Sequence, residues 1–308
     1  MKVAIDKYLD HLPLARQSRI LERYGVTVTT QTLWDQLDAV AKRLRPVYDE
    51  IFARLLRRGV IGLDQTSWKR LENKKAKPWQ MWCLTSDDTV YHRICDDKGA
   101  KTFKELVGDY EGVIVCDALS THEAGARDGP GITLAGCWAH VFRYFRDAEG
   151  DHPEALLAME WIGELYDIDE RAGDDVDERA RLRREESSLV LEKMKAWLWS
   201  QATLKTLSIG KAARYTLGNW ERLTRFVDNP HIMLDNNRTE RGIRGPVVGR
   251  RNHFGSKSRR GTEVAATFYT LIETSKLVGV DPAAYLRAAV RAADLGEVML
   301  PAELAAAD

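Results

Sequence analysis

The sequence predicts a mixed α/β fold of the α+β type, and three observations support this prediction. Two short apolar runs, 60–63 and 112–116, are each followed by an aspartate, which is typical of a buried strand that delivers its last side chain to a sheet edge. Strand-like and helix-like stretches alternate between residues 58 and 146. Residues 147–225 are then mostly helical in pattern, so a helical region interrupts the α/β part of the chain.

The first 57 residues are predicted to be helical. Leu14–Arg23 forms a short helix, Tyr24–Val26 a turn, and Thr29 or Thr30 caps a longer helix from Thr32 to about Leu44. Two helices across a glycine-containing turn resemble a helix-turn-helix. Two interpretations stay open, a DNA-reading motif or helices that only pack, because the second helix lacks a basic face near its start.

Residues 58–146 are expected to form the first part of an α/β core. Strands fit 60–71, 80–85 and 90–94, and Ser86-Asp87-Asp88 suits a hairpin turn between the last two. The remaining expected elements are a helix over 100–106, a strand over 112–117, and a strand over 131–137 that runs into a helix from about His140.

The segment 147–225 is predicted to be a helical insertion. Its tryptophans are expected in the core, with a stacking platform for an unpaired base as the alternative; they are Trp161, Trp197, Trp199 and Trp220. Residues 226–280 are expected to complete the core, with a helix over Thr262–Leu277. Residues 281–308 form a C-terminal helical element that Asp281-Pro282 begins, because proline is well tolerated in a first helical turn.

Charge is unevenly distributed in a chain whose formal net charge is zero. Residues 147–186 carry fifteen acids and five arginines, a net −10, whereas residues 238–260 carry eight basic residues and one acid, a net +7. Clustered cations are the electrostatic footprint of phosphate contacts, and a merely solvated basic face is the alternative. The glycines among them are expected to let the backbone approach phosphates. The candidate DNA-binding residues are Arg241, Arg244, Arg250, Arg251, Lys257, Arg259 and Arg260.

Three carboxylates stand in settings that suit a metal-dependent nuclease. Asp64 and Asp117 end predicted strands, and Glu240 lies in a predicted helix just before the basic stretch. Such a set can hold two divalent cations about 3.5–4 Å apart, which stabilise the attacking and leaving oxygens of a phosphodiester displacement. Magnesium prefers oxygen ligands. A single strand-end aspartate is more often a turn former or cap, so the interpretation depends on all three and on their surroundings.

Those surroundings resemble the transposase domain of the insertion sequence sixty-six family of bacterial mobile elements. The similar segments run in the family's order over nearly the whole chain. They are the opening segment 7–17, Leu63-Asp64-Gln65-Thr66 for the "DET" strand, Cys137–Phe145 for "CWAHxRRxF", Asp235–Arg241 for "DNNxxER", and Gly279–Leu286 for "GxDPxxYL".

Departures from the family pattern accompany this resemblance. Gln65 replaces the usual glutamate, and Ala118-Leu119 follows Asp117 where the family often has glycine. Full-length members also carry a cysteine-rich, zinc-finger-like part and a leucine-zipper-like helix at the N-terminus. This chain starts after both, and we therefore expect a truncated product or an excised domain.

The resemblance implies a DDE transposase with an RNase-H-like catalytic core. Asp117 and Glu240 are 123 residues apart, which implies a helical insertion between the second and third carboxylates. Asp64, Asp117 and Glu240 would be the catalytic and metal-binding triad, with two Mg²⁺ or Mn²⁺ ions as cofactors. The implied partners are DNA, as transposon ends and target, and further copies of the chain in a transposition complex, with no membrane. The expected location is the bacterial cytoplasm, at the nucleoid.

Two other functions stay open on the sequence. One is an RNase-H-fold nuclease that hydrolyses DNA without strand transfer. The other is a non-catalytic DNA-binding remnant of a transposase. The residue types and their order do not separate these hypotheses.

His140 and the cysteines complete the set of candidate residues. Cys137 and His140 have C-x-x-H spacing without a second pair to complete a zinc site, although transposases of several groups carry a similar feature. His140 is either active-site support or a hydrogen-bonded structural histidine. Asp235 is expected to cap a helix. Buried free thiols are predicted for Cys83, Cys95, Cys116 and Cys137.

Overall fold

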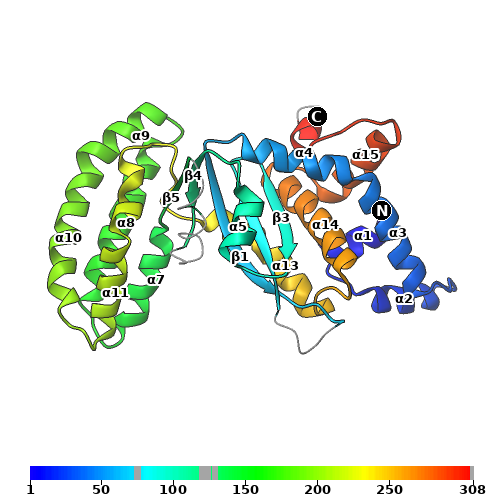
Figure 1. Cartoon of the computed structure of the whole chain (residues 1–308), viewed down its shortest axis with the longest axis horizontal. Helices are drawn as coiled ribbons and strands as arrows, with labels where there is room; N and C mark the ends of the chain where they lie inside the picture. Colours follow the sequence, from blue (N-terminus) through cyan, green and yellow to red (C-terminus); the bar gives the residue numbers. More distant parts are fainter. Residues whose placement is uncertain (73–77, 118–125, 127–130, 306–308) are drawn as a thin grey trace. The chain divides into compact units, whose positions relative to one another are not determined.

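The structure, a computed structural model, describes residues 1–72, 78–117, 126 and 131–305 (Figure 1). The chain divides into two compact units. Unit 1 comprises Met1–Tyr110 and Arg238–Asp308, and unit 2 comprises Glu111–Asn237. Ala118 and Leu119, where the sequence departs from the family pattern, lie outside the described residues.

Unit 1 is built around three antiparallel strands. They are β1 (Val60–Trp68), β2 (Trp79–Thr85) and β3 (Val90–Cys95). The backbone N–H of Ser86 donates to the carbonyl of Thr89 at 2.9 Å, which confirms the predicted hairpin turn between β2 and β3. The order of three antiparallel strands followed by helix α5 (Ala100–Val107) is the predicted one, although β1 ends earlier than expected.

Side chains satisfy the outer edge of β3. Thr270 Oγ1, in helix α14 (Arg259–Leu277), accepts from the backbone N–H of His92 at 2.8 Å. Thr274 Oγ1 accepts from Val90 N–H at 3.1 Å and donates to its carbonyl at 2.8 Å. Tyr48, in helix α4 (Arg45–Leu56), donates to the His92 carbonyl at 2.8 Å. Unpaired edge groups invite pairing with another chain, so these bonds close the sheet on this side.

The other helices of unit 1 surround this sheet and α14. The Thr29 hydroxyl accepts from the Thr32 backbone N–H at 3.1 Å, so the predicted cap is confirmed. The Asp281 carboxylate accepts from the Ala284 backbone N–H at 2.7 Å and caps the helix predicted to begin there. Among the described residues, no helix combines the length and apolar character needed to cross a membrane. The helices are α1 (Lys2–Ala4), the π-helical turn Ile5–Leu9, α2 (Leu14–Arg23), α3 (Thr30–Arg43), α13 (Asn237–His253), α15 (Pro282–Asp294) and α16 (Pro301–Ala305).

Unit 2 contains the parallel strands β4 (Gly112–Val115) and β5 (Ile132–Ala135) and a group of packed helices (Figure 1). The predicted helical character of 147–225 is confirmed. Trp161, Trp197 and Trp220 are half-buried, whereas Trp199 is 62% exposed, so the expectation of a core position is wrong for Trp199. The helices are α7 (Trp138–Glu149), α8 (Ala155–Ala172), α9 (Val176–Leu182), the π-helical turn Arg183–Ser187, α10 (Ser188–Ala202), α11 (Ser208–Gly218), α12 (Trp220–Thr224) and the 3₁₀ turn Arg225–Val227.

A buried cation joins the helices of unit 2 to the segment that precedes α13. Arg183 is 1% exposed and binds the Asp169 carboxylate at 2.7 and 2.5 Å. The same guanidinium donates to the carbonyls of Phe226, Asn229 and Ile232 at 2.9, 3.2 and 3.0 Å. The planar five-donor fork of arginine suits this set of acceptors, so Arg183 fixes the path of residues 226–232.

We predict that Arg183→Met lowers the free energy of unfolding of unit 2 by about 3–5 kcal/mol, because it leaves a partly buried carboxylate and three carbonyls without their donor. Urea unfolding monitored by tryptophan fluorescence measures the change. Arg184→Met is the matched control, since Arg184 is exposed and bonds only the Ala180 carbonyl of its own helix. Equal stability of the two variants would contradict the assignment.

Candidate active site and nucleic-acid interface

Asp64 lies inside β1 and not at its end, so the prediction of a strand-end carboxylate is wrong for this residue. It belongs to a row of three side chains across the sheet of unit 1. It stands opposite Cys83 of β2, and Cys83 stands opposite His92 of β3. Cross-strand partners project from the same face of an antiparallel sheet, so the three share one face. Helix α13 covers this face, because Cys83 Sγ lies 3.9 Å from the Thr239 carbonyl and His92 Nε2 lies 3.0 Å from the Gly242 carbonyl.

The first turn of α13 is seated directly on β2. The hydroxyls of Thr239 and Thr85 are 2.6 Å apart. A Cβ on Gly242 would lie 3.0 Å from Val90 Cγ1 and 3.2 Å from Cys83 Sγ, so only glycine fits without a shift of its neighbours. Glu240 belongs to this turn and is half-buried, as is Asp64. The structure therefore puts the strand of the first predicted carboxylate and the helix of the third on a common face.

The glycines of α13 serve helix packing. A Cβ on Gly245 would overlap the Glu273 carboxylate, and one on Gly249 would overlap the Tyr269 hydroxyl, both in α14. The prediction that the glycines of the basic stretch admit phosphates is wrong for Gly242, Gly245 and Gly249. They lie in a continuous helix and allow it to approach the sheet and α14 closely.

In unit 2, Asp117 follows β4 at the carboxyl edge of the parallel pair. The backbone N–H of Cys116 donates to the Ala135 carbonyl at 3.1 Å, and β5 leads through Gly136 to α7, whose first turn carries the half-buried His140. The carboxyl ends of neighbouring parallel strands share one edge, where α/β proteins place their ligands. Asp117 and the beginning of α7 therefore meet at the edge of unit 2 suited to a site.

Two of the motifs are in contact within unit 2. The Asn236 backbone N–H donates to Cys137 Sγ at 3.3 Å, and Trp138 N–H donates to the Leu234 carbonyl at 2.9 Å. Asp235 accepts from Asn237 N–H at 2.8 Å at the start of α13, and from the Tyr166 hydroxyl at 2.7 Å. The predicted capping role of Asp235 is confirmed.

The cysteines are free, and three of the four are buried, with Cys95 half-buried. Burial raises the pKa of Cys137 to about 11, so this thiol is protonated at neutral pH. Burial, followed by the negative charge of Asp64, raises the pKa of Cys83 well above its usual value.

Within the described residues, no three His, Cys, Asp or Glu side chains form a ready metal site. Asp64 and Glu240 belong to unit 1 and Asp117 to unit 2, and each unit is described by itself. The predicted triad and its metal ions therefore stay a prediction.

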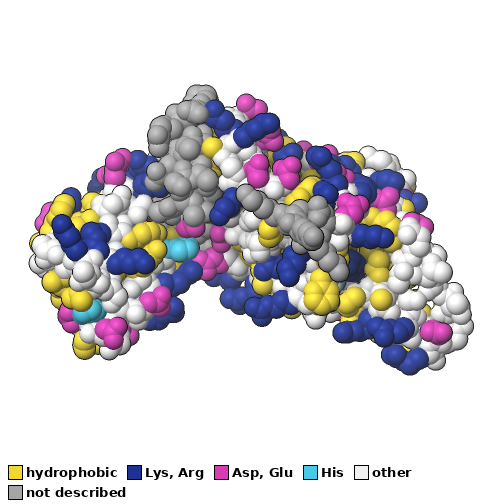
Figure 2. Space-filling view, turned by 60° about the horizontal axis from the view of Figure 1, so that its bottom comes forward, with side chains coloured by type: hydrophobic (Ala, Val, Ile, Leu, Met, Phe, Trp, Pro, Cys, Tyr) yellow, Lys and Arg dark blue, Asp and Glu magenta, His cyan; other side chains and the backbone are white. Residues whose placement is uncertain are grey.

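Five of the predicted DNA-binding residues form an exposed set, the basic surface, which consists of Arg241, Arg244, Arg251, Lys257 and Arg259. The first three lie on one face of α13, since they are three and seven residues apart. The other two predicted residues have partners inside unit 1. Arg250 donates to Thr66 Oγ1 and to Ser67 Oγ, each at 3.2 Å, and Arg260 binds Asp38 at 2.5 Å and Glu263 at 3.0 Å. Figure 2 shows Lys and Arg side chains gathered on the visible face of this unit, with hydrophobic side chains among them.

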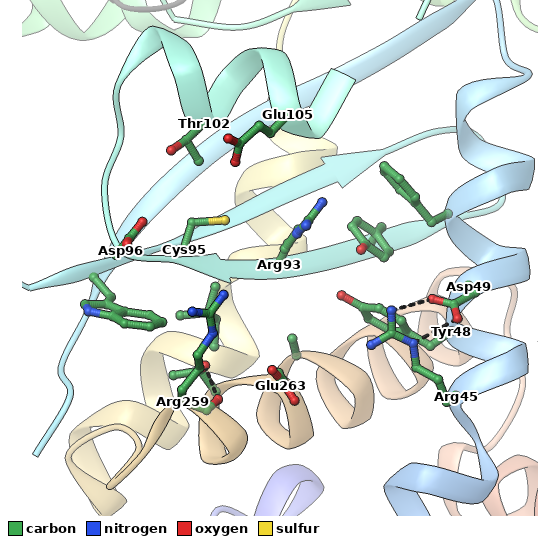
Figure 3. Close-up of a pocket in the computed structure, with 16 residues that line it drawn as sticks. Arg45, Tyr48, Asp49, Arg93, Cys95, Asp96, Thr102, Glu105, Arg259 and Glu263 are labelled. Carbon is green, nitrogen blue, oxygen red and sulfur yellow. Dashed lines mark hydrogen bonds and ion pairs between the residues drawn. The ribbon is translucent and has the colours of Figure 1, made fainter. Parts of the chain in front are cut away.

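A cavity of about 440 Å³ lies beside β3 in unit 1 (Figure 3). Tyr91, Arg93 and Cys95 line it from the face of β3 opposite to His92, so it does not open on the face of Asp64. Arg259 is the one predicted site residue among its described lining residues. Arg45 lines the cavity from helix α4, and its guanidinium donates to the Asp49 carboxylate of the same helix at 2.8 Å.

The row of Asp64, Cys83 and His92 was not predicted from the sequence, although a signal for part of it was present. The turn Ser86-Asp87-Asp88 fixes Thr85 opposite Val90, and counting back along both strands places Cys83 opposite His92. No local signal reveals that Gly242 bonds this histidine from 150 residues away.

Residues 1–264 match the sequence profile of the Transposase IS66 family. The chain belongs to this family. Three relatives from Sinorhizobium fredii (strain NBRC 101917 / NGR234), the uncharacterized proteins y4qI, y4jD and y4hP, are 32%, 30% and 29% identical to it over 308, 306 and 314 residues.

Each of these alignments covers 92% of the chain and 57–60% of the relative. The chain thus spans about three-fifths of the length of the curated relatives that it matches. Family membership confirms the resemblance found in the motifs.

We predict that unit 1 loses stability as pH falls from 6.5 to 4. Burial lowers the pKa of His92 from 6.5 to about 4, so the unfolded chain takes up a proton in this range before the folded one does. The stability is therefore complete above pH 6.5, and about 3 kcal/mol of it is lost by pH 4. Urea unfolding in EDTA should show that His92→Gln removes this part of the pH dependence. A control variant, His231→Gln, changes an exposed histidine and should keep it; identical pH profiles for both variants would count against the role of His92.

We also predict that alanine at all five positions of the basic surface weakens DNA binding by a similar factor for all sequences. Each lost phosphate contact should reduce the slope of log affinity against log salt by about 0.9. Fluorescence anisotropy over a salt series measures the slope. The control is Arg43→Ala with Arg57→Ala, since both arginines already pair with acids. A slope unchanged in the five-residue variant would mean that this surface is only solvated.

Proposed function

We propose that this chain is the catalytic part of a DDE transposase that cuts DNA at the ends of a mobile element and joins the freed end to target DNA. The observation that carries the proposal is the packing of α13, whose first turn includes Glu240, on the face of β1 and β2 that bears Asp64. Family membership supports it independently. Asp117 is proposed as the third carboxylate, in line with the family's order of motifs.

The donor atoms on this face fit a hard divalent cation. Asp64 and Glu240 offer carboxylate oxygens from half-buried positions. Of the neighbouring donors, burial raises the pKa of the Cys83 thiol well above its usual value, and His92 Nε2 bonds the Gly242 carbonyl. An all-oxygen set suits magnesium or manganese. Asp64, Glu240 and Asp117 would hold two such ions, which supply charge stabilisation to the attacking and leaving oxygens.

The residues of the chain itself would orient the DNA. Arg241 and Arg244 stand about one helical turn along from Glu240, where they would bind phosphates close to the cleaved one. Such contacts fix the position of the duplex without reading its sequence. In strand cleavage, water attacks the phosphodiester and the 3′-oxygen leaves; in strand transfer, that 3′-hydroxyl attacks a phosphodiester of target DNA at the same site.

Helices α2 and α3 are interpreted either as a DNA-reading helix-turn-helix or as helices that only pack, and both interpretations stay open. The exposed residues in the first turns of α3 include Gln31 and Asp35, and they are bonded to each other at 2.7 Å. Asp38 of the same helix binds Arg260 of α14. These contacts favour a packing role.

We predict that Asp64→Asn, Asp117→Asn and Glu240→Gln each reduce metal-dependent DNA cleavage at least about 1000-fold, because loss of one ligand removes several kcal/mol of transition-state stabilisation. Nicking of supercoiled plasmid in Mg²⁺ or Mn²⁺ measures cleavage, and joining of a labelled 3′-end oligonucleotide measures transfer. Asp147→Asn, at a carboxylate with 74% of its side chain exposed, is the control.

The pattern of losses decides between the hypotheses. Activity lost in only one of the three variants would mean that the triad is misassigned. Cleavage without joined products would favour the nuclease, and a folded wild-type chain that binds DNA but never cuts it would favour the non-catalytic remnant.

A further inference from the structure

Phe254 has an unusual conformation for an aromatic residue. It follows the last residue of α13 with φ of 63°, in the left-handed region, and its side chain is 63% exposed. Glycine or asparagine normally takes this place after a helix, since a bulky side chain clashes there with its own backbone. At this position the backbone conformation is strained for phenylalanine, and the exposure of its apolar ring to water is unfavourable. A residue that is kept despite both costs points to a function.

The backbone around Phe254 is firmly held. Its N–H donates to the Arg250 carbonyl at 2.8 Å, Ser256 N–H donates to the Lys69 carbonyl at 3.0 Å, and Leu71 N–H donates to the Ser256 carbonyl at 2.8 Å. Gly255 has φ of 111°, and a Cβ there would overlap the Lys69 carbonyl. The residues on both sides of Phe254 are therefore tied to unit 1, and the ring projects from a fixed base.

The surroundings of the ring are positively charged. Arg251, Lys257 and Arg259 are all exposed and lie within five residues of Phe254. Within the part of the chain that the structure describes, none of the three forms an ion pair. Proteins combine exposed aromatic rings with nearby cations to stack on unpaired bases or to wedge into a disrupted base step, and Phe254 has such cations before and after it in the sequence.

We propose that Phe254 stacks on a DNA base at an unpaired or disrupted step while Arg251, Lys257 and Arg259 hold the flanking phosphates. The inference rests on the proposed function in that the ligand is DNA, and it adds that this DNA is locally unpaired. Stacking is sequence-tolerant because every base has a π-face, so the site recognises distortion rather than sequence.

The test compares a short duplex containing a central unpaired bubble with the fully paired duplex, using the full chain. Phe254→Asn removes the ring but tolerates the left-handed backbone. The variant should bind the bubble about 5- to 150-fold more weakly than wild type, the effect of losing one stacked base, with little change on the paired duplex. Its thermal midpoint should be equal to or above that of wild type, which excludes misfolding as the cause.

Two further measurements sharpen the result. The fluorescence of 2-aminopurine placed in the bubble should be quenched by wild type and by Phe254→Trp, but not by Phe254→Asn. Tyr24→Ala, at an aromatic ring that is 80% exposed elsewhere in unit 1, should behave as wild type.

An unchanged affinity of Phe254→Asn for the bubble, or an equal loss on both duplexes, would overturn the inference and leave the proposed function standing. A wild-type chain that binds neither DNA would overturn both.

Discussion

The contact on which the rest of unit 1 depends is the close seating of α13 against the sheet. Gly242 leaves room for Cys83 and Val90, and its carbonyl bonds the buried His92 side chain. Because a larger residue would push the helix away, this glycine sets the distance between the turn of Glu240 and the strand of Asp64. Gly249 does the same at the far end of α13, against Tyr269. A helix poor in intrinsic stability is thus held by tertiary packing.

Helix α13 and the residue after it therefore carry three kinds of side chain along one line, namely a carboxylate, a row of arginines and an aromatic ring. Its first turn carries Glu240, its exposed face carries Arg241, Arg244 and Arg251, and its end carries the ring of Phe254. Phe254 comes fourteen positions after Glu240, which is roughly 21 Å at the helical rise per residue. Helix α14 holds both β3 and the end of α13. Its Thr270 and Thr274 hydroxyls accept hydrogen bonds from the edge of β3. The hydroxyl of its Tyr269 lies 3.1 Å from Nε2 of His253, the last residue of α13.

Most elements could be predicted from the sequence, whereas the contacts between distant segments could not. The Ser86–Asp88 turn, the cap at Thr29 and the start of a helix at Asp281-Pro282 depend on local patterns, and the structure confirms them. The ends of the strands are predicted less well, since β1 stops at Trp68 and Asp64 lies inside it. The glycines of α13 misled the prediction, because glycine is a poor helix former and its packing role appears only once the sheet and α14 are in place. Arg250 reaches Thr66 across 184 residues, so nothing local separates it from the exposed arginines. Of the candidate site, the structure shows that α13 packs on the face of the sheet that bears Asp64, and the roles of Asp64, Asp117 and Glu240 stay predictions.

The central claim is that Asp64, Asp117 and Glu240 together hold the metal ions of a DNA-cleaving centre. Anomalous diffraction from crystals of the chain soaked in Mn²⁺ tests it most directly. The account predicts two peaks about 3.5–4 Å apart, bounded by these three carboxylates, and their loss in Asp64→Asn crystals. Manganese bound reproducibly elsewhere, or a Glu240 side chain turned away from a metal held by the two aspartates, would contradict it.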